Sequence, residues 1–471
     1  MAVRNCAGSL FAVAVLVAAG FFLCPPAEAK GSLAYECPYL GDPTRQTLEP
    51  MTQGQQGWFF RKTDFRENFE VLPDTAKYMA RLATAFKKQG AQLMIMPVPP
   101  RIMGAIKYTV KDQQFQNSYD LEAAKASFAG FLKQIEDTGV TVVDLRDVSL
   151  SETDKQHFFF KRDVHWTTYG ANLAAKRVGE TVRKMPDHNT TGEAKYHSEQ
   201  IDSDLLESKM ALEIQQLCKS TVPLEEMPGF ATTLVSSGAA GEDALFGDST
   251  AEKMIVLGSS YSAGEKFNFA GFLSEFSGME VANFAISGGQ LFNAIISYTS
   301  LPEAERLHPR VVLWEALSHY DFNEGGSKFR QLIPAIYGEC KKENAVLSRE
   351  FHLDGNTQPL ILQVPKEKNI QGKKYFLFIN TSSKDVVKFT LDLDHADGDG
   401  EWITIDRTDH FTSTGRFFLE LNDELSAPLT SVTISNMPEA RGTMEVRLCQ
   451  SPEGEEEAAE VPTKTTTTAT P

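Results

Sequence analysis

The sequence predicts an α/β domain with a parallel sheet, followed by an all-β sandwich. From about residue 74 to 338, segments with helical periodicity alternate with short apolar runs, which is the rhythm of a parallel sheet covered by helices. After Cys340 the pattern changes to short stretches of alternating apolar and polar residues separated by turns, which is typical of a β-sandwich. Hydrophobic residues make up 42% of the 471 residues, enough to form packed cores.

Composition divides the chain into four segments. We expect a signal peptide in residues 1–29, the α/β domain in 30–342, the sandwich in 343–450 and a disordered acidic tail in 451–471. Within the α/β domain, the polar and Gly/Ser-rich stretch at about 186–250 is interpreted as an insertion that carries a helix near 203–217.

The N-terminus has the three parts of a signal peptide. Arg4 supplies a positive charge, residues 9–23 are apolar or small, and Ala27-Glu28-Ala29 has the small-x-small form of a cleavage site. Bulky residues just before Cys24 argue against a lipoprotein anchor. The apolar run is short for a membrane span, and no other segment is long and apolar enough for one. We therefore expect cleavage after Ala29 and export of the remaining chain.

The net charge of −17 is unchanged by that cleavage, which removes one base and one acid. Such an acidic chain is not expected to bind nucleic acid through bulk charge. It does not attract an acidic polymer globally either. An anionic substrate would therefore need local Lys or Arg side chains.

Apolar periodicity places the elements of the α/β domain. Residues 74–89 repeat apolar side chains at helical spacing, and residues 92–97 form an apolar run stopped by prolines. By the same reasoning, helices are predicted at about 74–89, 120–137, 163–184, 290–300 and 326–338, and strands at 92–97, 140–145, 254–257, 281–284 and 310–314.

Period-two alternation places the strands of the sandwich. They are predicted at 375–379, 386–394, 402–405, 416–421, 431–434 and 444–448.

Four cysteines remain after the predicted cleavage, and an even number in an exported chain suggests disulfides. Three pairings are possible. Cys340 and Cys449 bracket the β-rich segment, whereas Cys37 and Cys218 both lie in the preceding domain, so we predict Cys37–Cys218 and Cys340–Cys449. The alternative is buried free thiols. The sequence has no CxxC or His-rich spacing, and neither a metal nor another cofactor is expected.

Ser260 follows the apolar run 254–257 through a tight Gly258-Ser259 turn. A serine at the carboxyl end of a strand, before a helix, points into the crevice where open α/β sheets bind ligands. The following helix offers free backbone amides to a developing oxyanion. Ser260 is therefore a candidate nucleophile, and the alternative is a helix-capping serine.

A serine nucleophile needs a base, and the base needs an orienting carboxylate. Asp163 and His165 lie two residues apart, so one loop presents both, although such a pair is also found in polar turns. They lie 95 residues before Ser260, which is acceptable because triads assemble in space and not along the chain. Asp409-His410 is a weaker rival for the base.

A resemblance joins these motifs. The Gly258-Ser259-Ser260-Tyr261-Ser262 turn, the RDVHWT element around His165 and the GWFF element at 57–60 resemble the SGNH-hydrolase-like domain of alginate O-acetyltransferases. The order of signal peptide, this domain and a β-rich carbohydrate-binding module resembles the same family up to about residue 450. The family's two disulfides correspond to the pairings predicted above.

The resemblance implies roles for individual residues. Ser260 matches the nucleophile, His165 the base and Asp163 its orienting partner. The 283–289 segment resembles the family's glycine block, with Ala285 at the glycine position, so amides of Ser260 and of the 285–289 loop would hold the oxyanion. The asparagine block has no match after strand 310–314, which leaves Asn293 or Tyr320 as its substitute. Residues expected to line the site are Ala285, Gly288, Gly289, Tyr261, Tyr320, Arg162 and Arg101.

An anionic polymer is the implied acceptor, and the module offers candidate contacts. Along 386–394, Lys388 and Thr390 share the face opposite Phe389 and Leu391. Trp402 could add a stacking surface. The polysaccharide-binding candidates are Lys388, Thr390, Trp402 and Arg407, and the alternative for each is a solvated face or a core tryptophan.

The implied function is transfer of an acetyl group, through an acetyl-serine, onto O2 or O3 of mannuronate residues of alginate in the periplasm. The implied partners are polymannuronate, an unidentified acetyl donor such as a membrane-associated acetyl relay, and other periplasmic alginate export proteins. Two alternatives stay open. One is an acetylesterase with the same triad, and the other is a non-catalytic scaffold that guides the polymer.

Overall fold

The computed structural model describes residues 33–453, except 43, 47, 111–117, 154–155, 186–193 and 237–251. The predicted signal peptide and the tail beyond residue 453 lie outside the described residues, and the four segment boundaries stay predictions. Among the described residues, every helix is too short or too polar to span a bilayer.

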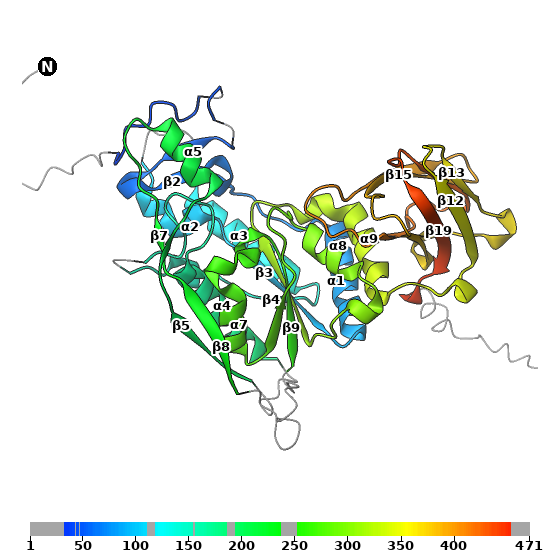
Figure 1. The fold of residues 1–471 in the computed structure, drawn as a ribbon, viewed down its shortest axis with the longest axis horizontal. Helices are drawn as coiled ribbons and strands as arrows, with labels where there is room; N and C mark the ends of the chain where they lie inside the picture. The colour runs from blue at the N-terminus through cyan, green and yellow to red at the C-terminus, as the bar shows by residue number, and fades with distance from the viewer. Residues whose placement is uncertain are drawn as a thin grey trace, which may run out of the picture. The chain divides into compact units, whose positions relative to one another are not determined.

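A five-stranded parallel sheet forms the centre of the first domain, in the order β10-β9-β11-β3-β4. Its strands β3, β4 and β9 are labelled in Figure 1. Its strands are β3 (Gln92–Val98), β4 (Thr141–Val142), β9 (Lys253–Leu257), β10 (Glu280–Asn283) and β11 (Val311–Leu317). All five predicted strands are present, with β4 shorter than predicted. The central strand β11 pairs with β3 over seven residues, and both strands are buried on both faces, as is typical of parallel strands covered by helices.

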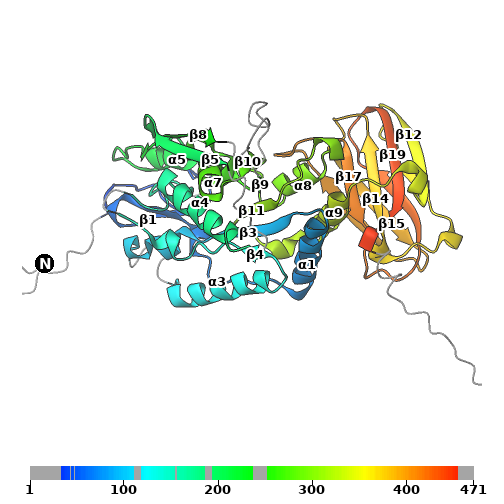
Figure 2. The same cartoon turned by 90° about the horizontal axis from the view of Figure 1, so that it is seen from below.

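Helices cover both faces of this sheet (Figure 2). One core cluster joins the sheet to α1 (Pro73–Lys88), α3 (Leu121–Glu136), α8 (Asn293–Thr299) and α9 (Gly326–Tyr337), and the other joins it to α2 (Arg101–Ala105), α4 (Thr168–Val182) and α7 (Phe269–Ser277). The sequence did not predict α7. The helix expected from residue 163 begins only at Thr168, because Thr167 caps it through the Gly170 amide.

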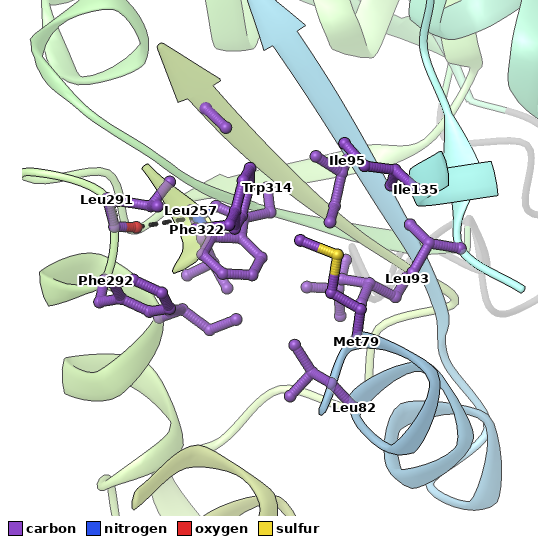
Figure 3. Packing of buried hydrophobic residues seen from close by; sticks show 14 of the residues in the cluster. Met79, Leu82, Leu93, Ile95, Ile135, Leu257, Leu291, Phe292, Trp314 and Phe322 are labelled. Carbon is purple, nitrogen blue, oxygen red and sulfur yellow. Dashed lines mark hydrogen bonds between the residues drawn. The ribbon is translucent and has the colours of Figure 1, made fainter. Parts of the chain in front are cut away.

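Strand β11 shows how the two cores divide its side chains. Val312 and Trp314 point into the first cluster, where Trp314 packs against Phe292 and Phe322 (Figure 3). The Trp314 indole N–H donates to the Leu291 carbonyl over 3.0 Å. Leu313 and Leu317 point into the second cluster. By this alternation Glu315 lies on the second face, beneath the end of β9.

The stretch interpreted as an insertion contains an antiparallel pair of β5 (Lys195–Gln200) with β8 (Phe230–Ser236), a short pair of β6 (Asp204–Leu205) with β7 (Glu226–Met227), and helix α5 (Lys209–Leu217). The predicted helix is present but starts later than residue 203, because Ser208 caps it at the Ala211 amide. The strands were missed because their side chains are mostly polar and exposed.

The C-terminal domain consists of two four-stranded antiparallel sheets, in the orders β12-β19-β14-β17 and β13-β18-β15-β16. Its strands are β12 (Leu347–Asp354), β13 (Leu360–Gln363), β14 (Tyr375–Thr381), β15 (Lys388–His395), β16 (Gly400–Asp406), β17 (Arg416–Glu420), β18 (Leu429–Ser435) and β19 (Arg441–Gln450). The six predicted strands are present. The edge strands β12 and β13 were missed because charged and exposed residues interrupt their alternation.

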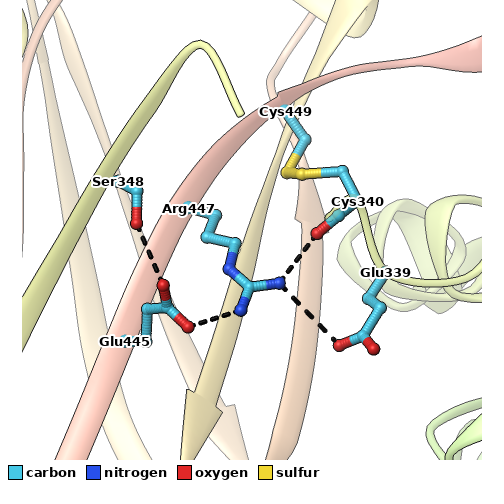
Figure 4. Close-up of a disulfide and its surroundings, with 6 residues drawn as sticks. All are labelled: Glu339, Cys340, Ser348, Glu445, Arg447 and Cys449. Atoms are coloured by element: carbon cyan, nitrogen blue, oxygen red, sulfur yellow. Dashed lines mark hydrogen bonds and ion pairs between the residues drawn. A yellow bond between two sulfur atoms is a disulfide. The ribbon is translucent and has the colours of Figure 1, made fainter. Parts of the chain in front are cut away.

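Two disulfides join described residues, and they are the predicted pairs Cys37–Cys218 and Cys340–Cys449. Arg447 lies beside the second disulfide and donates to the Cys340 carbonyl over 2.8 Å (Figure 4). Helix α9 packs on β17, and Arg330 of that helix donates to the Glu420 carbonyl and forms an ion pair with Glu401. Both α9 and Cys340, which precede the C-terminal domain in the chain, are therefore bonded to it.

Candidate active site

Ser260 stands at the carboxyl end of β9. The strand ends at Leu257, Gly258 and Ser259 form the turn, and α6 (Ser260–Ala263) begins at once. Ser259 caps this short helix by accepting the Tyr261 amide. Because β9 lies inside a parallel sheet, its carboxyl end opens on the edge where this fold class binds ligands.

The structure brings Ser260, His165 and Asp163 together in one hydrogen-bonded chain. His165 Nε2 lies 2.7 Å from Ser260 Oγ, and His165 Nδ1 lies 2.5 Å from Asp163 Oδ1. An ionised Asp163 accepts the Nδ1 proton, so Nε2 of the neutral ring is left to accept the serine hydroxyl. This is the arrangement of a serine activated by a histidine base.

A short loop presents the histidine. The Phe160 amide donates to the His165 carbonyl over 3.1 Å, and Phe159 bridges to Trp166. Tyr261 is buried directly after the serine, and its hydroxyl donates to the Val164 carbonyl. The His165 ring packs against the rings of Tyr261 and Phe267, with centroid distances of 4.9 and 5.4 Å. Tyr261 therefore joins the serine turn to the histidine loop, and it does not line the site as expected.

Asp163 is almost fully buried, at 1% exposure. Burial alone would raise the pKa of its carboxyl, but hydrogen bonds from the His165 ring, the Ser208 hydroxyl and the His165 amide lower it to about 2. Asp163 is therefore an anion at neutral pH. Ser208 was not predicted, and it comes from the N-cap of α5, whose other end carries the Cys37–Cys218 disulfide.

The expected oxyanion loop is only partly available. The Ala285 amide donates to the Asn283 side chain over 3.0 Å, and the Gly289 amide donates to the Ile286 carbonyl over 2.8 Å. The expectation that Ala285 and Gly289 offer free amides is therefore wrong in this structure, because two local turns take up both donors. In the described part of the chain, the amides of Ser260 and Gly288 have no protein acceptor.

The candidates for a second side-chain donor are differently placed. The Asn293 amide group donates to the Asp409 carbonyl over 3.3 Å, so it is tied to the C-terminal domain. Tyr320 is half-buried near Glu315, and burial raises the pKa of its hydroxyl. His410 lies against Gly288, where an added Cβ would come within 2.7 Å of the imidazole. His410 forms no bond to Ser260, and His165 takes the position of the base.

Both arginines predicted to face the substrate are bound to protein groups. Arg101 is 2% exposed and donates to Asp64 over 2.8 Å and to the Phe160 carbonyl over 2.7 Å. Arg162 donates to the Tyr35 hydroxyl and lies 3.7 Å from Glu225. The expectation that they bind an anionic sugar directly is therefore corrected. Arg101 instead braces the loop that carries His165.

The module candidates separate into an exposed and a buried pair. Trp402 on β16 is 73% exposed and lies opposite Asp392 of β15. Lys388 is exposed on the same face and pairs with Asp406 over 2.6 Å. Thr390 is covered, at 3% exposure, and accepts a hydrogen bond from Asn436. The predicted strand 386–394 is observed as β15 from Lys388, and its alternation is interrupted at Thr390, which is buried and not open to a ligand.

Arg407 lies away from that face. It is buried, and burial lowers the pKa of its guanidinium to about 9. It donates to the Ser300 hydroxyl at the end of α8 over 3.1 Å and to the Arg416 carbonyl over 2.8 Å. The expectation of a polysaccharide contact is therefore wrong for Arg407 in this structure, because its guanidinium is buried against Ser300 and the Arg416 carbonyl.

Within the described residues, no group of three or more His, Cys, Asp or Glu side chains is arranged to hold a metal ion.

A parallel α/β sheet with a Ser-His-Asp chain at its carboxyl edge, joined to an antiparallel β-domain, defines a serine-hydrolase-like protein with an appended module. The family model described as "SGNH hydrolase-like domain, acetyltransferase AlgX" matches residues 51–317. A second model, a C-terminal carbohydrate-binding module, matches residues 339–461. The chain belongs to the AlgX family, which confirms the resemblance seen in the sequence.

Known proteins agree with this assignment. The alginate biosynthesis protein AlgX of Pseudomonas aeruginosa is 27% identical over 85% of this chain and 82% of its own length. The solved structure of P. aeruginosa AlgX has the same fold, with a TM-score of 0.76 at 24% identity over 88% of this chain and 99% of that one. The probable alginate O-acetylase AlgJ of Pseudomonas syringae pv. tomato is 25% identical over 57% of this chain and 68% of its own length.

Proposed function

We propose that this protein is an alginate O-acetyltransferase that carries the acetyl group on Ser260. The hydrogen-bonded chain from Ser260 through His165 to Asp163 is the observation that carries the proposal. Its relatives are named for alginate biosynthesis and, in the case of AlgJ, for probable alginate O-acetylation. These names support a role in alginate biosynthesis and acetylation for this chain as well.

The first half-reaction loads the serine. His165 Nε2 takes the hydroxyl proton as Ser260 Oγ attacks the carbonyl carbon of an acetyl ester, and the carbonyl oxygen becomes an oxyanion. The C–O bond to the leaving alcohol then breaks, and His165 returns the proton to that alcohol. Acetyl-Ser260 remains, with no net change in protons.

Free backbone amides stabilise the oxyanion. The Ser260 amide stands at the start of α6, and the Gly288 amide follows in the 285–289 loop. In other enzymes a single donor of this kind contributes about 3–4 kcal/mol to the transition state. The second half-reaction repeats the chemistry in reverse, because a mannuronate O2 or O3 hydroxyl gives its proton to His165 and attacks the acetyl-serine carbonyl.

The acceptor separates this proposal from an acetylesterase. The purified protein is incubated with 4-nitrophenyl acetate, with and without oligomannuronate, and the products are identified by mass spectrometry. We expect oligomannuronate carrying added acetyl groups, with 4-nitrophenol released in equal amount. Release of free acetate alone, with unmodified oligomannuronate, would instead identify an esterase.

The third reading, a polymer-guiding scaffold, is favoured by one observation, the exposed Trp402 on the module. It is compatible with catalysis in the same chain. An alginate-producing strain that carries Ser260→Ala separates the two roles, since a scaffold should still export polymer when acetyl transfer is lost. Export of unacetylated alginate would show both functions in one protein.

Trp402→Ala is expected to weaken polymannuronate binding about 10-fold, because the sugar ring loses a flat apolar surface. Isothermal titration with oligomannuronate measures the effect. The matched control is Val235→Ala, which removes another exposed apolar side chain, 67% exposed, from strand β8 of the first domain. Equal affinity of Trp402→Ala and wild type would remove Trp402 from the binding face.

The place of action proposed for this chain is the periplasm, reached by cleavage after Ala29. Its proposed partners are polymannuronate, a membrane-associated acetyl relay as the source of acetyl groups, and other alginate export proteins. N-terminal sequencing of the exported protein tests the cleavage, and a retained residue 1 would contradict it.

A further inference from the structure

Glu315 is a buried carboxylate beneath the serine turn. It lies on β11, is 2% exposed, and faces away from the Trp314 core by strand alternation. In the described part of the chain it forms no ion pair with Lys or Arg. A buried carboxylate without a basic partner is costly, and burial raises the pKa of Glu315. Its retention there calls for an explanation.

All its hydrogen bonds go to residues that flank the nucleophile. The Ser259 amide donates to Glu315 Oε2 over 2.7 Å, and the Ser259 hydroxyl donates to the same oxygen over 2.9 Å. The Ser262 hydroxyl donates to it over 3.2 Å. One carboxylate therefore fixes the residue before Ser260 and the residue two positions after it.

The turn is shaped around this carboxylate. A Cβ added at Gly258 would lie 2.5 Å from Glu315 Oε2, so a glycine is needed where the two strands meet. Ser259 links Glu315 to Tyr261, because its hydroxyl donates to Glu315 and accepts a hydrogen bond from the Tyr261 amide. Ser260 itself does not contact Glu315, and its hydroxyl is left to His165.

We propose that Glu315 is a positioning residue that holds the Ser259–Ser262 turn so that Ser260 Oγ stays in line with His165. Both oxygens of a carboxylate accept hydrogen bonds, and the Ser259 hydroxyl also lies 3.1 Å from Oε1, whereas an amide of the same shape replaces one acceptor with an N–H donor. Displacing a nucleophile by a fraction of an ångström slows attack without changing the groups that bind substrate. The inference rests on the proposed acyl transfer through Ser260.

Glu315→Gln tests the inference because it keeps the shape and removes the charge. We expect kcat for 4-nitrophenyl acetate to fall about 10- to 100-fold, with KM within about 2-fold of wild type. Because burial disfavours the anion, the unfolding temperature is expected to stay level or rise. The matched control is Glu420→Gln, another carboxylate at 2% exposure, whose partner is Arg81. Wild-type kcat in Glu315→Gln would overturn the inference.

If Glu315→Gln folds poorly, Ser259→Ala alone tests the inference: kcat should fall with KM within about 2-fold of wild type, and wild-type kcat would contradict it. If both variants fold, a double-mutant cycle tests whether the two residues act together. Ser259→Ala removes the hydroxyl that Glu315 holds, so its effect on kcat and that of Glu315→Gln should not multiply. Independent, multiplying effects would contradict a shared positioning role. The burst of 4-nitrophenol released on acylation distinguishes failure of the proposed acyl transfer from failure of the role proposed for Glu315. No burst in wild type contradicts the proposed function, whereas equal burst rates in wild type and Glu315→Gln contradict only the role of Glu315.

Discussion

Ser260→Ala is expected to lower acetyl transfer on the order of 10⁶-fold, which is the loss that removing a triad serine causes in other enzymes. The reason is that no other described hydroxyl lies within hydrogen-bonding distance of His165 Nε2. The fold should be kept, because the Ser260 side chain bonds to nothing else and removing a hydroxyl leaves little space. Transfer to oligomannuronate, followed by mass spectrometry, measures the loss.

The control for this substitution is Ser274→Ala in α7. Ser274 is also nearly buried, and its hydroxyl bonds only to the Ala270 carbonyl of its own helix. Full activity of this variant, with matching circular dichroism for both, assigns the loss to the chemistry of Ser260. Residual transfer above a few per cent in Ser260→Ala would mean that another group carries the acetyl.

Asp163→Asn is expected to lower kcat about 10⁴-fold with little change in KM. The carboxylate accepts the Nδ1 proton of His165 over 2.5 Å, and it also accepts the Ser208 hydroxyl. An asparagine amide can turn its N–H toward the ring, which places the ring proton on Nε2 and blocks its use as a base. The matched control is Asp120→Asn. Asp120 is the N-cap of α3, where its carboxylate accepts backbone amides of that helix and has no part in the Ser260–His165–Asp163 chain.

The same carboxylate links stability to pH. Its pKa in the folded protein, about 2, is below the ordinary value of 3.8. Ionised Asp163 therefore contributes about 2 kcal/mol to the free energy of unfolding. This contribution is complete above pH 3.8 and is lost as the pH falls toward 2. Urea unfolding of wild type and Asp163→Asn at pH 5 and pH 2.5 measures it. The stability difference between the two should shrink on acidification, and a constant difference would contradict the assignment.

Much of the fold is readable from the sequence for a simple reason. The strands of the parallel sheet are buried on both faces, so they appear as apolar runs such as residues 254–257, and the sandwich strands alternate as 386–394 does. The edge strands β12 and β13 and the β5–β8 pair carry many polar, exposed side chains, and the local sequence holds no such signal for them.

The site residues that lie in short sequence motifs were predicted, and those whose position depends on tertiary packing were missed. Asp163 and His165 share one loop, and Ser260 follows a strand, so local motifs were enough to select these three residues as candidates. Glu315 was not predicted as a site residue, because nothing in the local sequence says that β11 pairs with β9 next to the serine turn. Arg407 is of a residue type that often binds anionic groups, but the packing of the two domains buries it.

The most direct measurement is the mass of the protein after brief incubation with 4-nitrophenyl acetate and rapid acid quenching, without acceptor. The account predicts one added acetyl group, placed on Ser260 by peptide sequencing and removed when oligomannuronate is supplied before quenching. An unmodified Ser260 at a time when 4-nitrophenol is already released in a burst, or an acetyl group found on another side chain, would contradict it.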